Sequence, residues 1–228
     1  MINESKNEKS KKQIAYEQIK DQIIRHHLKP GSFLIERQIC TALNMSRVPV
    51  REAIQQLATE GLVTAVPSVG SFVSEIRYEQ VSQLYTVREY IEGLGARLCA
   101  QNITDEQLQS IEKIVEDMGI YIQEGQHEKL FEADIDFHKS IIKYSRNDIL
   151  ISIYETLVGQ ILRITILIDG NAQGIVSSHN FHIEILKYIR SRNMNEAENS
   201  IRAHIQSSKL NQLRNFAPDL YNATNFRN

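Results

Sequence analysis

The sequence predicts a mostly α fold, with an N-terminal winged helix-turn-helix followed by a C-terminal all-helical bundle of about six helices. Three observations predict it. Two short helical segments, 36–43 and 47–60, are separated by a tight turn at Asn44-Met45. Two β-prone runs then flank Pro67-Ser68-Val69-Gly70, a pattern typical of a hairpin with a flexible tip. Beyond Ile76, apolar residues recur only at helical spacing.

The composition is that of a soluble globular protein. The chain has 228 residues, of which 42% are hydrophobic and 24% charged, enough for one large or two small domains. The two cysteines, Cys40 and Cys99, fit no disulfide or metal spacing, which favours a cytoplasmic location. The polar, lysine-rich N-terminus does not resemble a signal peptide. Arg163 and Thr165 interrupt the longest apolar run, 161–168, so no membrane span is expected.

Helix start and stop signals divide the chain. Pro30-Gly31 ends the first helix, Gly61 closes the third, and Thr104 with Gln107 forms a capping box. The expected domains are a disordered lead (1–12), a winged helix-turn-helix DNA-binding domain (13–76), a helical effector-binding domain (78–213) and a tail (214–228). The expected helices are 13–27, 36–43, 47–60, 78–101, 104–124, 127–144, 147–168, 174–191 and 194–213.

The start of the helix 47–60 has the composition of a DNA-reading element. A helix-turn-helix lays the N-terminal end of its second helix in the major groove. Ser46 is the expected N-cap there, and Arg47 and Arg51 share one helical face. Arginine forks suit guanine O6 and N7 or phosphate oxygens. The net charge of −2 argues against a strongly basic DNA binder, so local placement of the arginines matters more than the total. A solvated arginine face is the alternative, which the hairpin behind it disfavours.

The N-terminal domain resembles the GntR family of bacterial regulators. The residues that carry the resemblance are Pro30-Gly31, Leu34, Glu36-Arg37, the run 46–54, Leu57, the run 60–63, Gly70 and Phe72-Val73. The resemblance implies DNA contacts at Arg37, Arg47 and Arg51, with the wing tip at Gly70, where the lack of a side chain allows close approach to the minor groove. Many relatives have a polar residue at the position of Val48. Valine can contact a thymine methyl group but offers no hydrogen bond.

The helical half contains one aspartate and three histidines that can converge. Asp134 and His138 are four residues apart and therefore project from one face of a helix. His182 and His204 are equidistant from Asn193, inside a polar turn, so two antiparallel helices folded there bring them level. Such a set can bind one divalent metal per chain, with zinc the first choice and nickel or manganese as alternatives. A lone histidine is usually a surface or satisfied core residue, and the other four histidines are interpreted so.

The same four residues are similar to the metal site of the FCD effector domain of the FadR subfamily, over about 78–213. That resemblance also covers an Arg-x-x-x-Glu pattern at Arg88 and Glu92. Arg88 is a candidate partner for an effector carboxylate, and Arg163 is a second. A structural ion pair is the alternative interpretation of Arg163.

Together these features predict a non-enzymatic transcriptional regulator, most simply a repressor. It would bind an inverted-repeat operator as a homodimer and respond to a small organic acid held beside the metal. Two alternatives remain open at this point. A metal-dependent enzyme would need the metal to activate water, and no nucleophile motif or second general base accompanies the ligands. In a pure metal sensor, the metal itself would be the signal.

Overall fold

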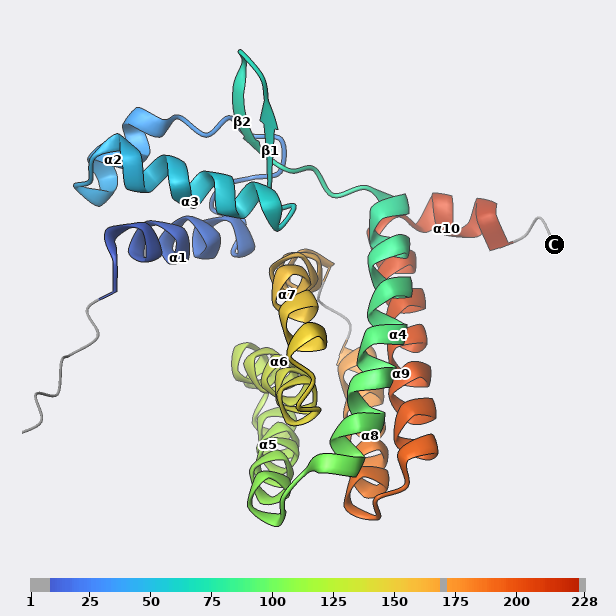
Figure 1. Cartoon of the computed structure of the whole chain (residues 1–228). Coiled ribbons are helices and arrows are strands. Elements are labelled where there is room, and N and C mark those ends of the chain that lie inside the picture. The colour runs from blue at the N-terminus through green and yellow to red at the C-terminus, as the bar shows by residue number, and fades with distance from the viewer. Residues whose placement is uncertain (1–8, 169–171, 226–228) are drawn as a thin grey trace, which may run out of the picture. The chain divides into compact units, whose positions relative to one another are not determined.

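A computed structural model describes residues 9–168 and 172–225, which form two compact units. One unit comprises Met1–Ile76 with Thr156–Leu167, and the other comprises Arg77–Glu155 with Ile168–Asn228. The fold class is as predicted, mostly helical with one two-stranded sheet (Figure 1). Residues 1–8 of the expected disordered lead lie outside the described residues.

The first unit contains the predicted winged helix-turn-helix. Its elements are α1 (Lys11–Ile24), α2 (Glu36–Leu43), α3 (Arg47–Thr59), β1 (Val63–Val66) and β2 (Gly70–Val73). Helix α1 begins two residues before its expected start because Ser10 caps it, accepting a hydrogen bond from the backbone N–H of Gln13. It ends at Ile24 rather than residue 27, and His26 is already left-handed, with φ of 58°. Asn44, with φ of 50°, makes the tight turn between α2 and α3.

A single apolar core fixes the position of helix α3. Its inward face, together with α1 and the base of the hairpin, is almost inaccessible to water. The members of this core are Ala15, Ile19, Ile23, Leu34, Val50, Ala53, Ile54, Leu57, Leu62, Val63 and Val73. The strands pair antiparallel from Val63 opposite Val73 to Val66 opposite Gly70, and Phe33 adds an isolated bridge to Phe72. Since one face of α3 is buried, its opposite face must lie in solvent.

The second unit is a helical bundle built around a long central pair. Helix α4 (Tyr78–Asn102) lies beside α9 (Met194–Phe216) along most of its length, and both also contact α8 (Ala172–Arg190) (Figure 1). Helix α6 (His127–Tyr144) packs on α4 and on α5 (Asp105–Glu124). The capping box of Thr104 with Gln107 at the start of α5 is formed as predicted. The bundle therefore directs α4, α6, α8 and α9 towards a common interior.

The segment 214–228, expected as a tail, is mostly helical in its described part. Helix α9 continues to Phe216, and a further helix, α10 (Pro218–Asn225), follows. Proline has no N–H to donate, so Pro218 cannot continue α9, yet it is well suited to the first position of a new helix. Residues 226–228 lie outside the described part of the chain.

Helix α7 (Asp148–Ile168) is unusually apolar. It is the one helix in the described residues with a length and mean hydropathy, 1.5, that would also allow a membrane span. The core helices of soluble proteins share both properties, and Leu150, Tyr154, Ile161 and Ile164 of this helix are buried.

Candidate functional site

The N-terminal end of α3 presents a compact set of exposed side chains. Arg47, Val48 and Arg51 all face solvent, and Val48 is 66% exposed. Most of the Val48 side chain is therefore open to contact by a partner. The predicted DNA-reading residues thus lie together on the outer face of α3, opposite the core residues Val50 and Leu57.

Ser46 occupies the predicted N-cap position, but its side chain makes no capping hydrogen bond. A capping hydroxyl normally accepts from the backbone N–H of the second or third helical residue. Here the third residue is Pro49, which has no N–H to donate. The exposed Ser46 hydroxyl is therefore available beside the free N–H groups of the first helical turn, where the helix dipole favours an anion such as a phosphate.

The three arginines assigned to DNA contact differ in their surroundings. The Nε of Arg51 donates a hydrogen bond of 2.8 Å to Oε2 of Glu36, the first residue of α2. Arg37 and Arg47 are exposed, and their guanidinium groups have no carboxylate partner in the described residues. Only Arg51 is therefore held in a defined orientation before DNA arrives. Sequence spacing gave no indication of this contact between helices.

The wing tip requires Gly70 for internal reasons. Its φ of +140° lies in a region that other residues rarely adopt, and an added Cβ would lie 2.4 Å from Cε2 of Phe33. Phe33 in turn packs edge-on against Phe72, with ring centroids 5.1 Å apart. Gly70 is thus part of the packing beneath the hairpin, a constraint separate from the close approach to DNA expected from sequence. The exposed apolar residue at the tip is its neighbour Val69, at 61%.

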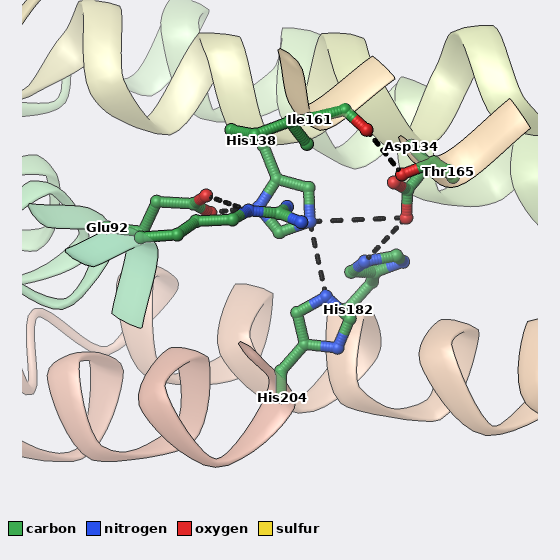
Figure 2. A network of polar contacts seen from close by, with 8 residues as sticks. Glu92, Asp134, His138, Ile161, Thr165, His182 and His204 are labelled. Carbon is green, nitrogen blue, oxygen red and sulfur yellow. Dashed lines mark hydrogen bonds and ion pairs between the residues drawn. The ribbon is translucent and has the colours of Figure 1, made fainter. Parts of the chain in front are cut away.

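In the second unit, one aspartate and three histidines converge from three helices. Asp134 and His138 lie on α6, His182 on α8 and His204 on α9 (Figure 2). Their nearest ligand atoms all lie within 4.8 Å of one another. Nε2 of His204 is 3.2 Å from Nε2 of His138, and Nε2 of His182 is 3.2 Å from Oδ1 of Asp134. The structure therefore brings together all four residues that the sequence singled out.

The three histidines of this cluster are buried, and His182 and His204 are held in the neutral state. Burial lowers the pKa of His182 and that of His204 well below the usual histidine value, and the neighbouring imidazoles lower both further. Both ring nitrogens of His182 and Nδ1 of His204 are buried without a hydrogen-bond partner in the described residues. Buried nitrogens without a hydrogen-bond partner are energetically unfavourable unless a ligand binds to them. Neutral imidazoles with free lone pairs are the form that a metal binds.

Glu92 lies behind the cluster, on the side of His138 away from Asp134 (Figure 2). Its Oε2 is 2.5 Å from Nδ1 of His138. Burial opposes ionisation of Glu92, but the charges of Arg88 and His138 outweigh it and leave its pKa lowered. The carboxylate thus turns Nδ1 of His138 towards itself and Nε2 towards the other ligands, the usual role of a group behind a metal-binding histidine.

The donor set fits a divalent metal. Ligand atoms at about 2.0–2.2 Å from zinc lie about 3–4 Å apart, close to the separations in this cluster. Three imidazoles and one carboxylate suit zinc, nickel or manganese, and leave room for further ligands in a six-coordinate ion.

The two arginines proposed for effector binding have different environments. Arg88 is buried and its Nε donates to Oε1 of Glu92, so its charge is matched within the protein. Arg163 belongs to the first unit and is also buried, and its Nη2 donates to the backbone carbonyl of Glu75. Its Nε and Nη1 have no partner in the described residues, and burial lowers its pKa to about 10. The structural ion pair considered for Arg163 is not among its contacts in the described residues.

Family models match both parts of the chain, and individual regulators match most of its length. The model for the FCD domain matches residues 83–207, and that for bacterial regulatory proteins of the gntR family matches residues 11–73. The Nta operon transcriptional regulator of Aminobacter aminovorans is 28% identical over 185 residues, which are 80% of this chain and 85% of that protein. The HTH-type transcriptional repressor RspR of Escherichia coli (strain K12) is 27% identical over 201 residues, 87% of this chain and 88% of that protein.

A solved structure, E. coli McbR/YncC, superposes with a TM-score of 0.79 at 20% identity, covering 91% of this chain and 99% of that one. At that identity the superposition supports the fold alone, which agrees with the two domain matches. The chain belongs to the GntR family of bacterial regulatory proteins and is a DNA-binding transcriptional regulator with a C-terminal FCD domain.

Proposed function

We propose that this regulator is a cytoplasmic homodimeric repressor whose operator binding is modulated by a small organic acid bound beside a divalent metal. The observation that carries the proposal is the convergence of Asp134, His138, His182 and His204 in the helical unit of a chain whose other unit is a winged helix-turn-helix. A largely buried donor set of this kind is not needed for DNA binding.

DNA binding is assigned to the outer face of α3 and its surroundings. Arg47 and Arg51 are proposed to contact bases or phosphates in the major groove, and Arg37 to contact the backbone. Ser46 would add a phosphate contact, Val48 an apolar contact to a thymine methyl group, and the wing at Gly70 an approach to the minor groove.

The metal is proposed to hold the effector. One zinc, nickel or manganese ion, bound by Asp134 and the three histidines, would supply a Lewis acid to which carboxylate oxygens can bind. Arg88 and Arg163 remain the two candidate guanidinium groups for an acid. Two buried nitrogens of Arg163 lack a partner in the described residues, whereas Arg88 is paired with Glu92.

Effector binding is proposed to act on DNA binding through α4. This helix carries Arg88 and Glu92 and follows directly on the link 74–77 from strand β2, so a displacement of α4 has a covalent route to the wing. We expect a panel of small carboxylic and sugar acids, titrated by calorimetry into metal-loaded protein, to contain at least one ligand.

A coupling of about 1–3 kcal/mol would change operator affinity about 5- to 150-fold, and operator DNA must change acid affinity by the same factor. Equal acid affinity with and without operator would exclude the switch. A change in operator affinity produced by metal alone, with no acid bound, would instead identify a pure metal sensor. Turnover of a substrate panel by the metal-loaded protein would favour the enzyme alternative.

The proposal of a homodimer rests on the geometry of operators. A single small reading helix has little contact area, and a two-fold protein reads two matched half-sites in an inverted repeat. We expect multi-angle light scattering of the full chain to give twice the monomer mass of 26.2 kDa at micromolar concentration. A monomer both alone and on DNA would contradict this part of the proposal.

A further inference from the structure

An acidic residue lies beside the proposed DNA-reading face. Glu36 begins α2, and its Oε2 accepts the 2.8 Å hydrogen bond from Nε of Arg51 on α3. The side chain of Glu36 is 33% exposed and that of Arg51 is 59% exposed, so the pair lies at the surface. A carboxylate at this place repels DNA phosphates, which makes its presence unfavourable for DNA binding in general.

The atoms used in the contact decide what Arg51 can still do. A guanidinium presents a side edge, formed by Nε and one Nη, and an end, formed by the two Nη groups. Glu36 occupies Nε, and the end remains to donate two parallel hydrogen bonds. Two parallel donors match O6 and N7 of guanine, the commonest base-specific arginine contact.

Arg47 provides an internal comparison. It lies one turn before Arg51 on the same exposed face of α3, yet no carboxylate holds its guanidinium in the described residues. An arginine without such a contact can turn its guanidinium to phosphates and bases alike. An arginine whose guanidinium is fixed by a carboxylate favours the partner that fits that orientation.

We propose that Glu36 is a positioning residue that holds Arg51 end-on for guanine, so that Glu36 sets sequence discrimination while weakening general DNA attraction. The inference rests on the proposed assignment of Arg51 to DNA reading. A second role for Glu36, stabilisation of α2, must be distinguished from this positioning role. Glu36 is the acidic residue of the first turn of α2, and an acid there stabilises the helix through its interaction with the helix dipole.

The test compares discrimination with affinity. Wild-type protein first selects its operator from a random double-stranded library. Affinities of wild type and Glu36→Gln are then measured for that sequence, for versions with each G·C pair replaced by A·T, and for a scrambled duplex, at several salt concentrations. We expect Glu36→Gln to bind the scrambled duplex more tightly and to lose about 5- to 50-fold of its preference for one G·C pair. An unchanged preference would overturn the proposal.

Three further variants identify the cause. Glu36→Asp keeps the charge and the helix-dipole contribution but is one methylene too short, so we expect it to lose discrimination as Glu36→Gln does. If Glu36→Asp kept the preference for that G·C pair, the effect of Glu36 would come from the helix dipole, and the positioning role would be overturned. Glu52→Gln, which removes an exposed acid next to Arg51 on α3, should leave the preference unchanged. In an Arg51→Ala background, Glu36→Gln should have no further effect on that G·C preference.

The same data separate this inference from the function on which it rests. If Arg51→Ala leaves operator binding intact, the DNA-reading assignment itself fails. If Arg51→Ala weakens operator binding while Glu36→Gln and Glu36→Asp both keep full discrimination, only the positioning role fails.

Discussion

Replacing Arg47 and Arg51 together by alanine is expected to remove most of the sequence-specific DNA affinity. A bidentate arginine contact to a base contributes about 1–3 kcal/mol, so the double variant should lose about 2–5 kcal/mol, or roughly 30- to several-thousand-fold in operator affinity. The upper limit is lower than the sum of two single-arginine contributions, because the effects of substitutions one helical turn apart are not fully additive. Fluorescence anisotropy with a labelled operator, at fixed salt, measures the change.

Lysine is the matched control for both positions. Arg47→Lys with Arg51→Lys keeps both charges, and hence phosphate attraction, but lysine cannot form the planar two-donor contact. We expect the lysine variant to retain binding to scrambled DNA and to lose preference for the operator. Both side chains are exposed, so the melting temperature should stay close to that of the wild type. Wild-type operator affinity in the alanine double variant would refute the assignment of this surface.

Removing the metal is expected to lower the melting temperature of the wild type by about 8–16 °C. A ligand that binds only the folded chain at a thousandfold excess over its Kd stabilises it by about 4 kcal/mol. For domains of 150–250 residues, each kcal/mol corresponds to about 2–4 °C. Calorimetry before and after chelation, with elemental analysis of the desalted protein, tests this for zinc, nickel and manganese in turn.

The variant His182→Ala distinguishes metal binding from packing. Alanine leaves a cavity that destabilises the chain with or without metal, so the informative quantity is the chelator-dependent part of the melting temperature. We expect that part to vanish in His182→Ala and to persist in Asp136→Ala, an exposed neighbour of two proposed ligands on α6. The metal site would be excluded if the wild-type chain retained no metal after incubation and its melting temperature did not change when chelator was added.

The convergence of the four proposed metal ligands could be predicted because it depends on local geometry. Asp134 and His138 are one helical turn apart, which places them together on any helix. His182 and His204 are brought level by the turn before α9, where Asn193 is the N-cap and its side chain accepts from the N–H of Glu196. Spacing along a helix and symmetry about a turn are both readable from sequence.

Contacts between separate helices could not be predicted in the same way. The approach of Glu36 to Arg51, and that of Glu92 to His138, depend on how two helices cross and on side-chain orientation, which no spacing encodes. Helix α10 was missed because a short segment after Pro218 has too few turns to show a periodicity. The sequence also shows that Pro49 removes one of the two N–H groups that could donate to Ser46, but not that the other, on Val48, makes no such bond.

The packing of Phe33 beneath the wing has a consequence for anyone who wishes to retarget this regulator to a new operator. Gly70 must be kept in a mutagenesis library, because every larger residue there collides with the ring of Phe33. Val48 and Val69 are the opposite case, since both are more than half exposed and neither belongs to the apolar core of the first unit. Randomising these two valines changes the outer surfaces of α3 and the wing while the scaffold that presents them is untouched.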